Sequence, residues 1–115
     1  MRTTTRVTFT DFDTTSEISG LDGSTYIVLV IHFSLELPRG SQVVSASVGI
    51  TTRQGRRSYE LIEPSWINQP PLAEAVVNYA RDCERLFRRS PMGEEHRHNP
   101  RTVELELDLS QVPPA

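Results

Sequence analysis

The sequence contains no lysine, only one cysteine, few aromatic residues and no long apolar run. A single cysteine cannot form an intramolecular disulfide, so a disulfide-stabilised scaffold is excluded. The longest apolar run, residues 26–33, is much shorter than the roughly 18 residues that a membrane-spanning helix needs. Residues 1–6 are polar and lead into a strand-like pattern without the apolar core of a signal peptide. We therefore expect no membrane partner and a cytoplasmic location.

All twelve basic residues are arginine, and the formal net charge is −3. Nucleic-acid-binding domains usually carry an excess of basic residues, so we do not expect a nucleic-acid partner for a chain with a negative net charge. Arginine is well suited to bidentate contacts with carboxylates or phosphates. A GC-rich genome is the simpler explanation for the missing lysines.

Period-two alternation of apolar and polar residues predicts five strands. The clearest covers residues 27–37, where every odd position is apolar. Its even positions are apolar only at the start, which predicts burial on both faces there and on one face at the end. The other strands are expected at 5–12, 42–52, 58–63 and 101–109, separated by loops at 13–24, 38–41, 53–57 and 91–100.

One amphipathic helix is expected between the fourth and fifth strands. Proline favours the first turn of a helix, which places the start at Pro70 or Pro71 and the end at Ser90. A short helical turn capped by Ser65 is expected before it. Apolar residues recur at three- and four-residue steps, at Leu72, Val76, Tyr79, Cys83 and Leu86.

These elements predict a single α+β domain over residues 1–115, with frayed ends at 1–4 and 111–115. The order β-β-β-β-α-β gives a mostly antiparallel sheet of about five strands with the helix packed on one face. Cys83 lies on the apolar side of the helix and is expected to be a small buried residue rather than a reactive thiol.

The acidic face of the last strand is the first candidate for partner binding. Period-two spacing places Glu104, Glu106 and Asp108 on one side of this strand. Nothing indicates the burial that would adapt these carboxylates to acid–base catalysis. A solvated face that discourages edge pairing is the alternative explanation.

The arginines of the helix are the second candidate. Arg81, Arg85 and Arg88 follow four- and three-residue steps and share an exposed face. This face either recognises phosphate or carboxylate groups, or is an ordinary solvated face whose arginines favour the helix C-terminus. Three further arginines occur in the predicted hairpin at 53–57, without an aromatic platform for stacking bases.

We expect no catalytic residues, no cofactor and no metal site. His96 and His98 follow two glutamates but stand two residues apart in a predicted loop, which does not match the usual zinc motifs. His32 is expected to be structural, because no nucleophile motif accompanies it.

Residues 43–67 carry the only resemblance to a known family. A strand and a glycine-containing hairpin lead to a strand in which Tyr59 and Leu61 precede Pro64, Trp66 and Ile67. This pattern resembles one family of bacterial immunity proteins, which neutralise polymorphic or contact-dependent toxins. The chain departs from the family beyond this segment, where an aromatic-rich part is replaced by a helix and an acidic strand. Trp66 itself is expected to be a core residue between sheet and helix.

The resemblance and the charged faces lead to one principal hypothesis and two alternatives. The chain is expected to be a non-enzymatic protein-binding domain, an immunity protein whose partner is a basic toxin domain. The first alternative is a structural or assembly subunit of a phage particle or another homo-oligomer. The second is a small hydrolase or an RNA-binding domain.

Overall fold

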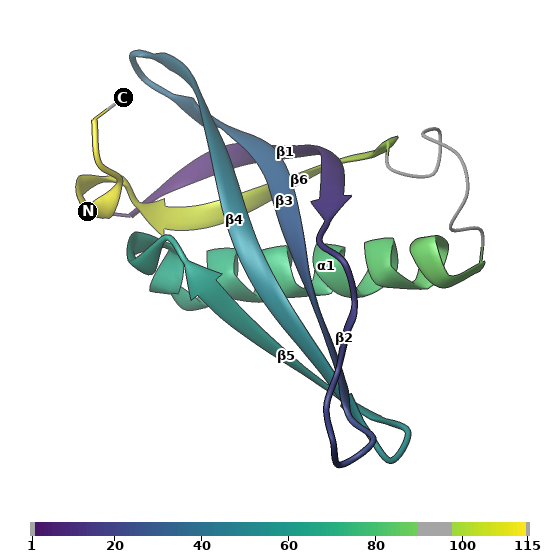
Figure 1. The fold of residues 1–115 in the computed structure, drawn as a ribbon. Helices are drawn as coiled ribbons and strands as arrows, with labels where there is room; N and C mark the ends of the chain where they lie inside the picture. The colour runs from purple at the N-terminus through teal and green to yellow at the C-terminus, as the bar shows by residue number, and fades with distance from the viewer. Residues whose placement is uncertain (1, 90–97, 115) are drawn as a thin grey trace.

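The computed structural model describes residues 2–89 and 98–114, which form one curled antiparallel sheet and one long helix (Figure 1). Alternating sequences give the strands β1 (Arg2–Thr14), β2 (Ile18–Ser19), β3 (Thr25–Leu37), β4 (Gly40–Arg53), β5 (Arg56–Glu63) and β6 (His98–Asp108). The helix α1 spans Pro70–Arg89. One short 3-10 turn, η1 (Ser65–Asn68), precedes α1, and a second, η3 (Leu109–Gln111), follows β6.

The strands are ordered β5-β4-β3-β1-β6, and β2 also pairs with β3. Every pairing is antiparallel. The edge strands are therefore β5 and β6, and α1 connects them by crossing one face of the sheet (Figure 1). The sequence-based fold class, an α+β domain with a mostly antiparallel sheet and one helix on one face, is confirmed.

The core lies between α1 and the covered face of the sheet. Odd positions of β3 and even positions of β4 face the helix and are buried, as the alternation predicts. On α1 the buried apolar positions are Leu72, Val76, Tyr79, Ala80 and Cys83. Tyr79 stacks on Phe9 with 4.6 Å between ring centres, which joins the helix to β1.

The helix begins at the first of the two expected prolines, Pro70, because proline has no N–H to satisfy in the first turn. Gln69, just before it, is buried and binds β6 through both amide atoms. Its Nε2 donates to the carbonyl of Asp108 at 3.0 Å, and its Oε1 accepts from the N–H of Asp108 at 2.7 Å. This side chain joins the start of α1 to the end of β6.

The structure corrects several sequence-based boundaries. Residues 2–4 are not frayed, because Arg2 pairs with Asp108 of β6 in the β1 ladder. Residues 98–100 belong to β6 rather than to a loop. The predicted tail also packs in part, since residues 109–111 form η3 and Val112 lies against the core.

Near η1, one prediction is wrong and a second holds only in part. Ser65 does not cap the turn, since the residue before the turn is Pro64 and no side-chain cap bond forms. Trp66 is only partly buried, whereas its neighbour Ile67 is fully buried. In the single turn of η1, Ile67 is the residue that faces inward, so the aliphatic side chain occupies the core position expected for the indole.

Candidate functional site

The face of the sheet opposite α1 is not covered by any described element, and we call it the open face. Tyr26 of β3 is 36% exposed, and Val28 and Val30 are partly exposed. The expectation that the start of this strand is buried on both faces is therefore wrong. The chain has one helix in its described part, and that helix covers the other side.

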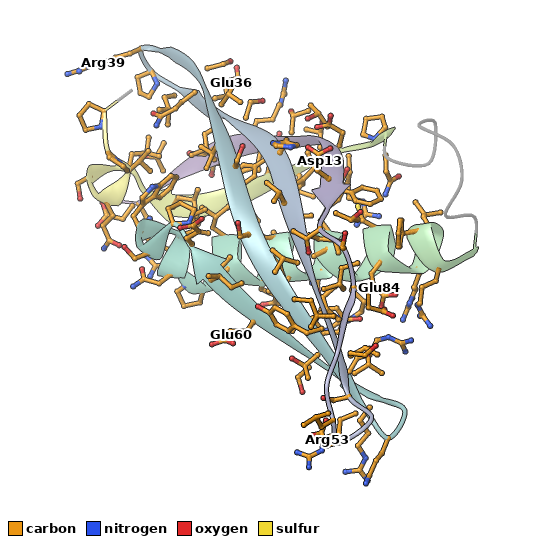
Figure 2. All side chains as sticks on the ribbon, viewed as in Figure 1. Asp13, Glu36, Arg39, Arg53, Glu60 and Glu84 are labelled. Carbon is orange, nitrogen blue, oxygen red and sulfur yellow. The ribbon has the colours of Figure 1, made fainter. Side chains whose placement is uncertain are left out.

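Acidic side chains dominate this open face. Register and contacts place Glu104 and Glu106 of β6 on it, together with three further exposed carboxylates from other strands. These are Asp13 of β1, Glu36 of β3 and Glu60 of β5, all labelled in Figure 2. The predicted acidic set of the last strand is thus part of a wider acidic surface.

Arg6 of β1 provides partial compensation on this face. It lies opposite Glu104 in the ladder, with Nη2 3.9 Å from Glu104 Oε1, and its Nε is 3.8 Å from Glu36 Oε2. All three side chains are more than half exposed, so solvent screens these ion pairs and each contributes little to stability. The carboxylates of this region still outnumber the guanidinium.

Asp108 has a different, local role. Its Oδ1 accepts hydrogen bonds from the N–H and the hydroxyl of Ser110, at 3.1 and 2.6 Å. These bonds favour the carboxylate form and lower the pKa of Asp108 below its usual value. Asp108 therefore caps the turn η3, unlike Glu104 and Glu106.

An apolar patch lies at one end of the open face. Tyr26 and Ile62 both contact Gly49 of β4, where a Cβ atom would lie 2.6 Å from Tyr26 Oη and 3.1 Å from Ile62 Cδ1. Ile18 of β2 pairs with Tyr26. Tyr26, Ile62 and Ile18 are 36%, 46% and 64% exposed. Together they form what we call the Tyr26 patch.

At the middle of the open face, three side chains from three strands form a hydrogen-bonded chain. His32 Nε2 lies 2.8 Å from Asp13 Oδ2, and His32 Nδ1 lies 2.8 Å from Ser45 Oγ. Sequence reasoning treated His32 as structural without a serine partner. Ser45 is found only from the register, which places it directly opposite His32 in the β3–β4 ladder.

This Asp–His–Ser chain has the connectivity of a nucleophile with its base and an orienting carboxylate. The N–H groups of β3 around His32 are engaged in the ladders with β1 and β4, so they are not available as an oxyanion hole. Two cavities among the described residues, of about 660 and 340 Å³, are lined by residues other than these three. The arrangement orients His32 on the surface.

The three predicted helix arginines do not form a uniform solvated row. Arg81 donates to Asn78 Oδ1 at 3.0 Å, and its guanidinium carbon lies 5.0 Å from the centre of the Tyr59 ring. Arg88 pairs with Glu84 through Nε. Arg85 is exposed and has no partner among the described residues. Arg81 therefore joins α1 to β5.

Glu84 is the charged residue that sequence reasoning missed. It is only 4% exposed, and it lies between Arg88 of the same helix and Arg57 of β5, whose Nε is 3.0 Å from Glu84 Oε1. Glu84 Oε1 has no hydrogen-bond partner among the described residues, so its contact with Arg57 is an ion pair without a hydrogen bond. The sequence does indicate its burial, because Glu84 follows Val76 and Ala80 at four-residue steps along the apolar stripe of the helix.

Cys83 is buried, as the sequence analysis predicted. Removal from water disfavours the thiolate and raises the pKa of Cys83 to about 11. Burial also raises the pKa of Tyr79, whose hydroxyl donates to the carbonyl of Asn99 at 2.5 Å. Both shifts favour the neutral forms of the phenol and the thiol.

The described residues include no group of three or more histidine, cysteine or carboxylate side chains that could hold a metal ion. The histidine pair considered for a metal, His96 and His98, and the preceding glutamates lie outside the described side chains. In residues 2–89 and 98–114, no helix combines the length and apolarity required to cross a membrane.

Comparison of the chain with protein-family models, with curated protein sequences and with solved structures gave no significant match.

Proposed function

We propose that this chain is a non-enzymatic domain that binds a basic protein partner through the open face of its sheet. One observation carries this proposal: an uncovered sheet face carries the Tyr26 patch at one end of β3 and an excess of carboxylates toward the other end. Protein interfaces combine aromatic and aliphatic contacts with charged groups. A partner that presents arginine or lysine beside an apolar contact would complement this face in charge.

The rigidity of the scaffold supports this use. Glu104 and Glu106 stand on β6. This strand is anchored by Leu107 in the core and by the two hydrogen bonds of Gln69 to Asp108. Groups fixed on a strand lose little conformational entropy when a partner binds, so more of the interaction energy is retained as affinity.

The specific form of the proposal is neutralisation of a bacterial toxin in the cytoplasm. Its support is the resemblance of residues 43–67 to immunity proteins, together with the acidic charge that a basic toxin domain would require. Tyr59, Leu61 and Ile67 of that pattern have core or partly buried positions, so the binding residues would be those of the open face.

Assembly into a homo-oligomer is the second candidate, and it is favoured by the outer edges of β5 and β6, which pair with no other described strand. An exposed edge can pair with another chain and extend the sheet. This candidate requires that the purified chain associate with itself, which the toxin hypothesis does not require.

The experiment starts from the neighbouring genes. If a secreted toxin is encoded directly upstream, its C-terminal domain should be expressed in cells with and without this chain. We expect co-expression to restore growth and the purified pair to form a complex. Failure of both, together with a self-associated chain in analytical ultracentrifugation, would instead support the assembly role.

A further inference from the structure

The structure brings two arginine-containing segments together that lie far apart in the sequence. Arg57, next to the β4–β5 hairpin, and Arg88, near the end of α1, both contact the buried carboxylate of Glu84. Arg81 lies on Tyr59, two residues after Arg57. We call Arg57, Arg81, Arg85 and Arg88 the arginine cluster.

Glu84 fixes two of these guanidinium groups in place. Each approaches the carboxylate most closely through Nε rather than through its outer, terminal Nη groups. The side chains of Arg57 and Arg88 are 29% and 48% exposed, so both are open to a ligand from solvent. The Glu84 side chain is only 5% exposed and is covered by the arginines and the protein.

Positive charge is in excess at this position. Glu84 is the only carboxylate that contacts the arginine cluster within the described residues, whereas the cluster carries four positive charges. The nearby Asp82 is paired with Arg101, with 2.8 Å between Asp82 Oδ2 and Arg101 Nη1. Arg85 has no described partner and stands one helical turn from both Arg81 and Arg88.

We propose that the arginine cluster is a binding site for a phosphate group, as inorganic phosphate or as a phosphate monoester. A phosphate monoester carries up to two negative charges and three strong acceptor oxygens. These oxygens can accept from the outer Nη groups of Arg57 and Arg88 together, while Arg85 contributes a third donor. A carboxylate offers one charge and two oxygens, so it satisfies this set less completely.

The arrangement favours one phosphate group over a nucleic-acid strand. Binding a strand requires a row of phosphate contacts and aromatic platforms for the bases. Here the ring of Tyr59, an aromatic side chain beside the cluster, is already covered by Arg81, whose guanidinium carbon lies 5.0 Å from the ring centre. The net charge of −3 would also repel a long polyanion.

The experiment is a titration followed by NMR on the arginine Nε–H signals, at low and constant ionic strength. Inorganic phosphate, O-phosphoserine and acetate are titrated separately into the full chain. We expect saturable shifts of the Arg57, Arg85 and Arg88 signals with phosphate, and acetate binding weaker by roughly tenfold. Comparable affinity for phosphoserine would identify a monoester as the ligand, and binding of phosphate alone would identify the free anion.

Two variants and one matched control decide the assignment. Arg85→Gln removes a donor that has no ion-pair or hydrogen-bond partner among the described residues, and Arg88→Lys keeps the charge but loses the planar guanidinium group. Each is expected to raise the Kd for phosphate by about three- to tenfold. The control is Arg39→Gln, since Arg39 is exposed in the β3–β4 turn at the opposite end of β4 from Arg53 (Figure 2).

Three results would overturn the proposal. One is the absence of saturable shifts up to tens of millimolar phosphate, and another is acetate binding as tightly as phosphate. The third is a loss of affinity in Arg39→Gln equal to that in Arg85→Gln, which would indicate a general charge effect. A melting temperature measured for each variant verifies that the fold is retained.

Discussion

Tyr26 lies diagonally across from Gly49 on the neighbouring strand of the open face, and its ring covers the glycine so closely that no side chain fits between them. A Cβ on Gly49 would lie 2.6 Å from Tyr26 Oη and 3.1 Å from its Cε1. The absence of a side chain at residue 49 therefore sets the position of an exposed aromatic ring that belongs to the proposed interface.

Gly49→Ala should displace Tyr26 outward with little effect on stability. The clash involves the end of a partly exposed side chain, which can rotate into solvent, and alanine is favoured over glycine in a strand by about 0.5–1 kcal/mol. We expect the free energy of unfolding to change by less than about 1 kcal/mol. Loss of nuclear Overhauser contacts between Tyr26 and Ile62 would report the displacement. A destabilisation of several kcal/mol would indicate that the ring cannot move.

The acidic part of the open face can be tested with Glu104→Gln combined with Glu106→Gln. Neither side chain is buried, so the fold should be retained, while association with a basic partner should slow and depend less on salt. Stopped-flow or biosensor kinetics at low and high salt provide the measurement. The matched control is Glu17→Gln with Glu74→Gln, which removes two exposed carboxylates elsewhere. Equal effects of the two pairs would assign the change to net charge alone.

Arg57→Ala should destabilise the protein, because it leaves the buried carboxylate of Glu84 with Arg88 as its remaining partner. Loss of one partner from a buried ion pair is costly, but partial exposure of both arginines reduces the effect to about 1–3 kcal/mol. Urea denaturation gives this free energy. The control Arg39→Ala alters an exposed arginine and should stay within about 0.5 kcal/mol of the parent chain. A neutral Arg57→Ala would show that water or Arg88 alone satisfies Glu84.

Stability should fall as the pH rises through 9 toward 11. The pKa of Cys83 is raised to about 11 in the folded chain, so the thiol of the unfolded chain loses its proton at a lower pH. Over this interval the unfolded state is therefore stabilised relative to the folded state. Tyr79 acts in the same direction, because its pKa is also raised. Cys83→Ala should flatten the decline between pH 9 and 11, measured as the urea midpoint against pH. An unchanged slope would show that other titrating groups cause the loss of stability at high pH.

Ile67→Ala should cost more than Trp66→Ala. Ile67 is fully buried, and removal of such a side chain typically costs about 2–5 kcal/mol. Trp66 is only partly buried, so we expect its loss to cost less than that of Ile67 in the same denaturation assay. The reverse order would mean that the indole contributes more packing than its exposure indicates.

Most of the fold could be predicted because its signals are local. Alternation over β3 and β6 and the apolar spacing of α1 require only near neighbours in the sequence. The limits of the strands were less accurate. Whether Arg2 starts a strand depends on Asp108, which lies at the other end of the chain and becomes its neighbour only in the folded sheet.

The site was less predictable for the same reason. Glu104 and Glu106 were found because two-residue spacing is visible in the sequence, but Arg6 lies opposite Glu104 only through the β1–β6 register. The chain of Asp13, His32 and Ser45 depends on two different ladders and carries no sequence motif. Pairings of this kind follow from topology, which alternation alone does not determine.

The position of β1 between β3 and β6 has a consequence for the order in which the protein folds. The pairs of β3 with β4 and of β4 with β5 join segments that follow each other closely, so they can form while the ribosome is still adding residues. The β1–β6 ladder closes the longest loop and waits until α1 has been made. Until then one side of β1 is unpaired, and another nascent chain can occupy it. Refolding yield should therefore decrease with protein concentration, since the late strand competes with intermolecular pairing for the same edge.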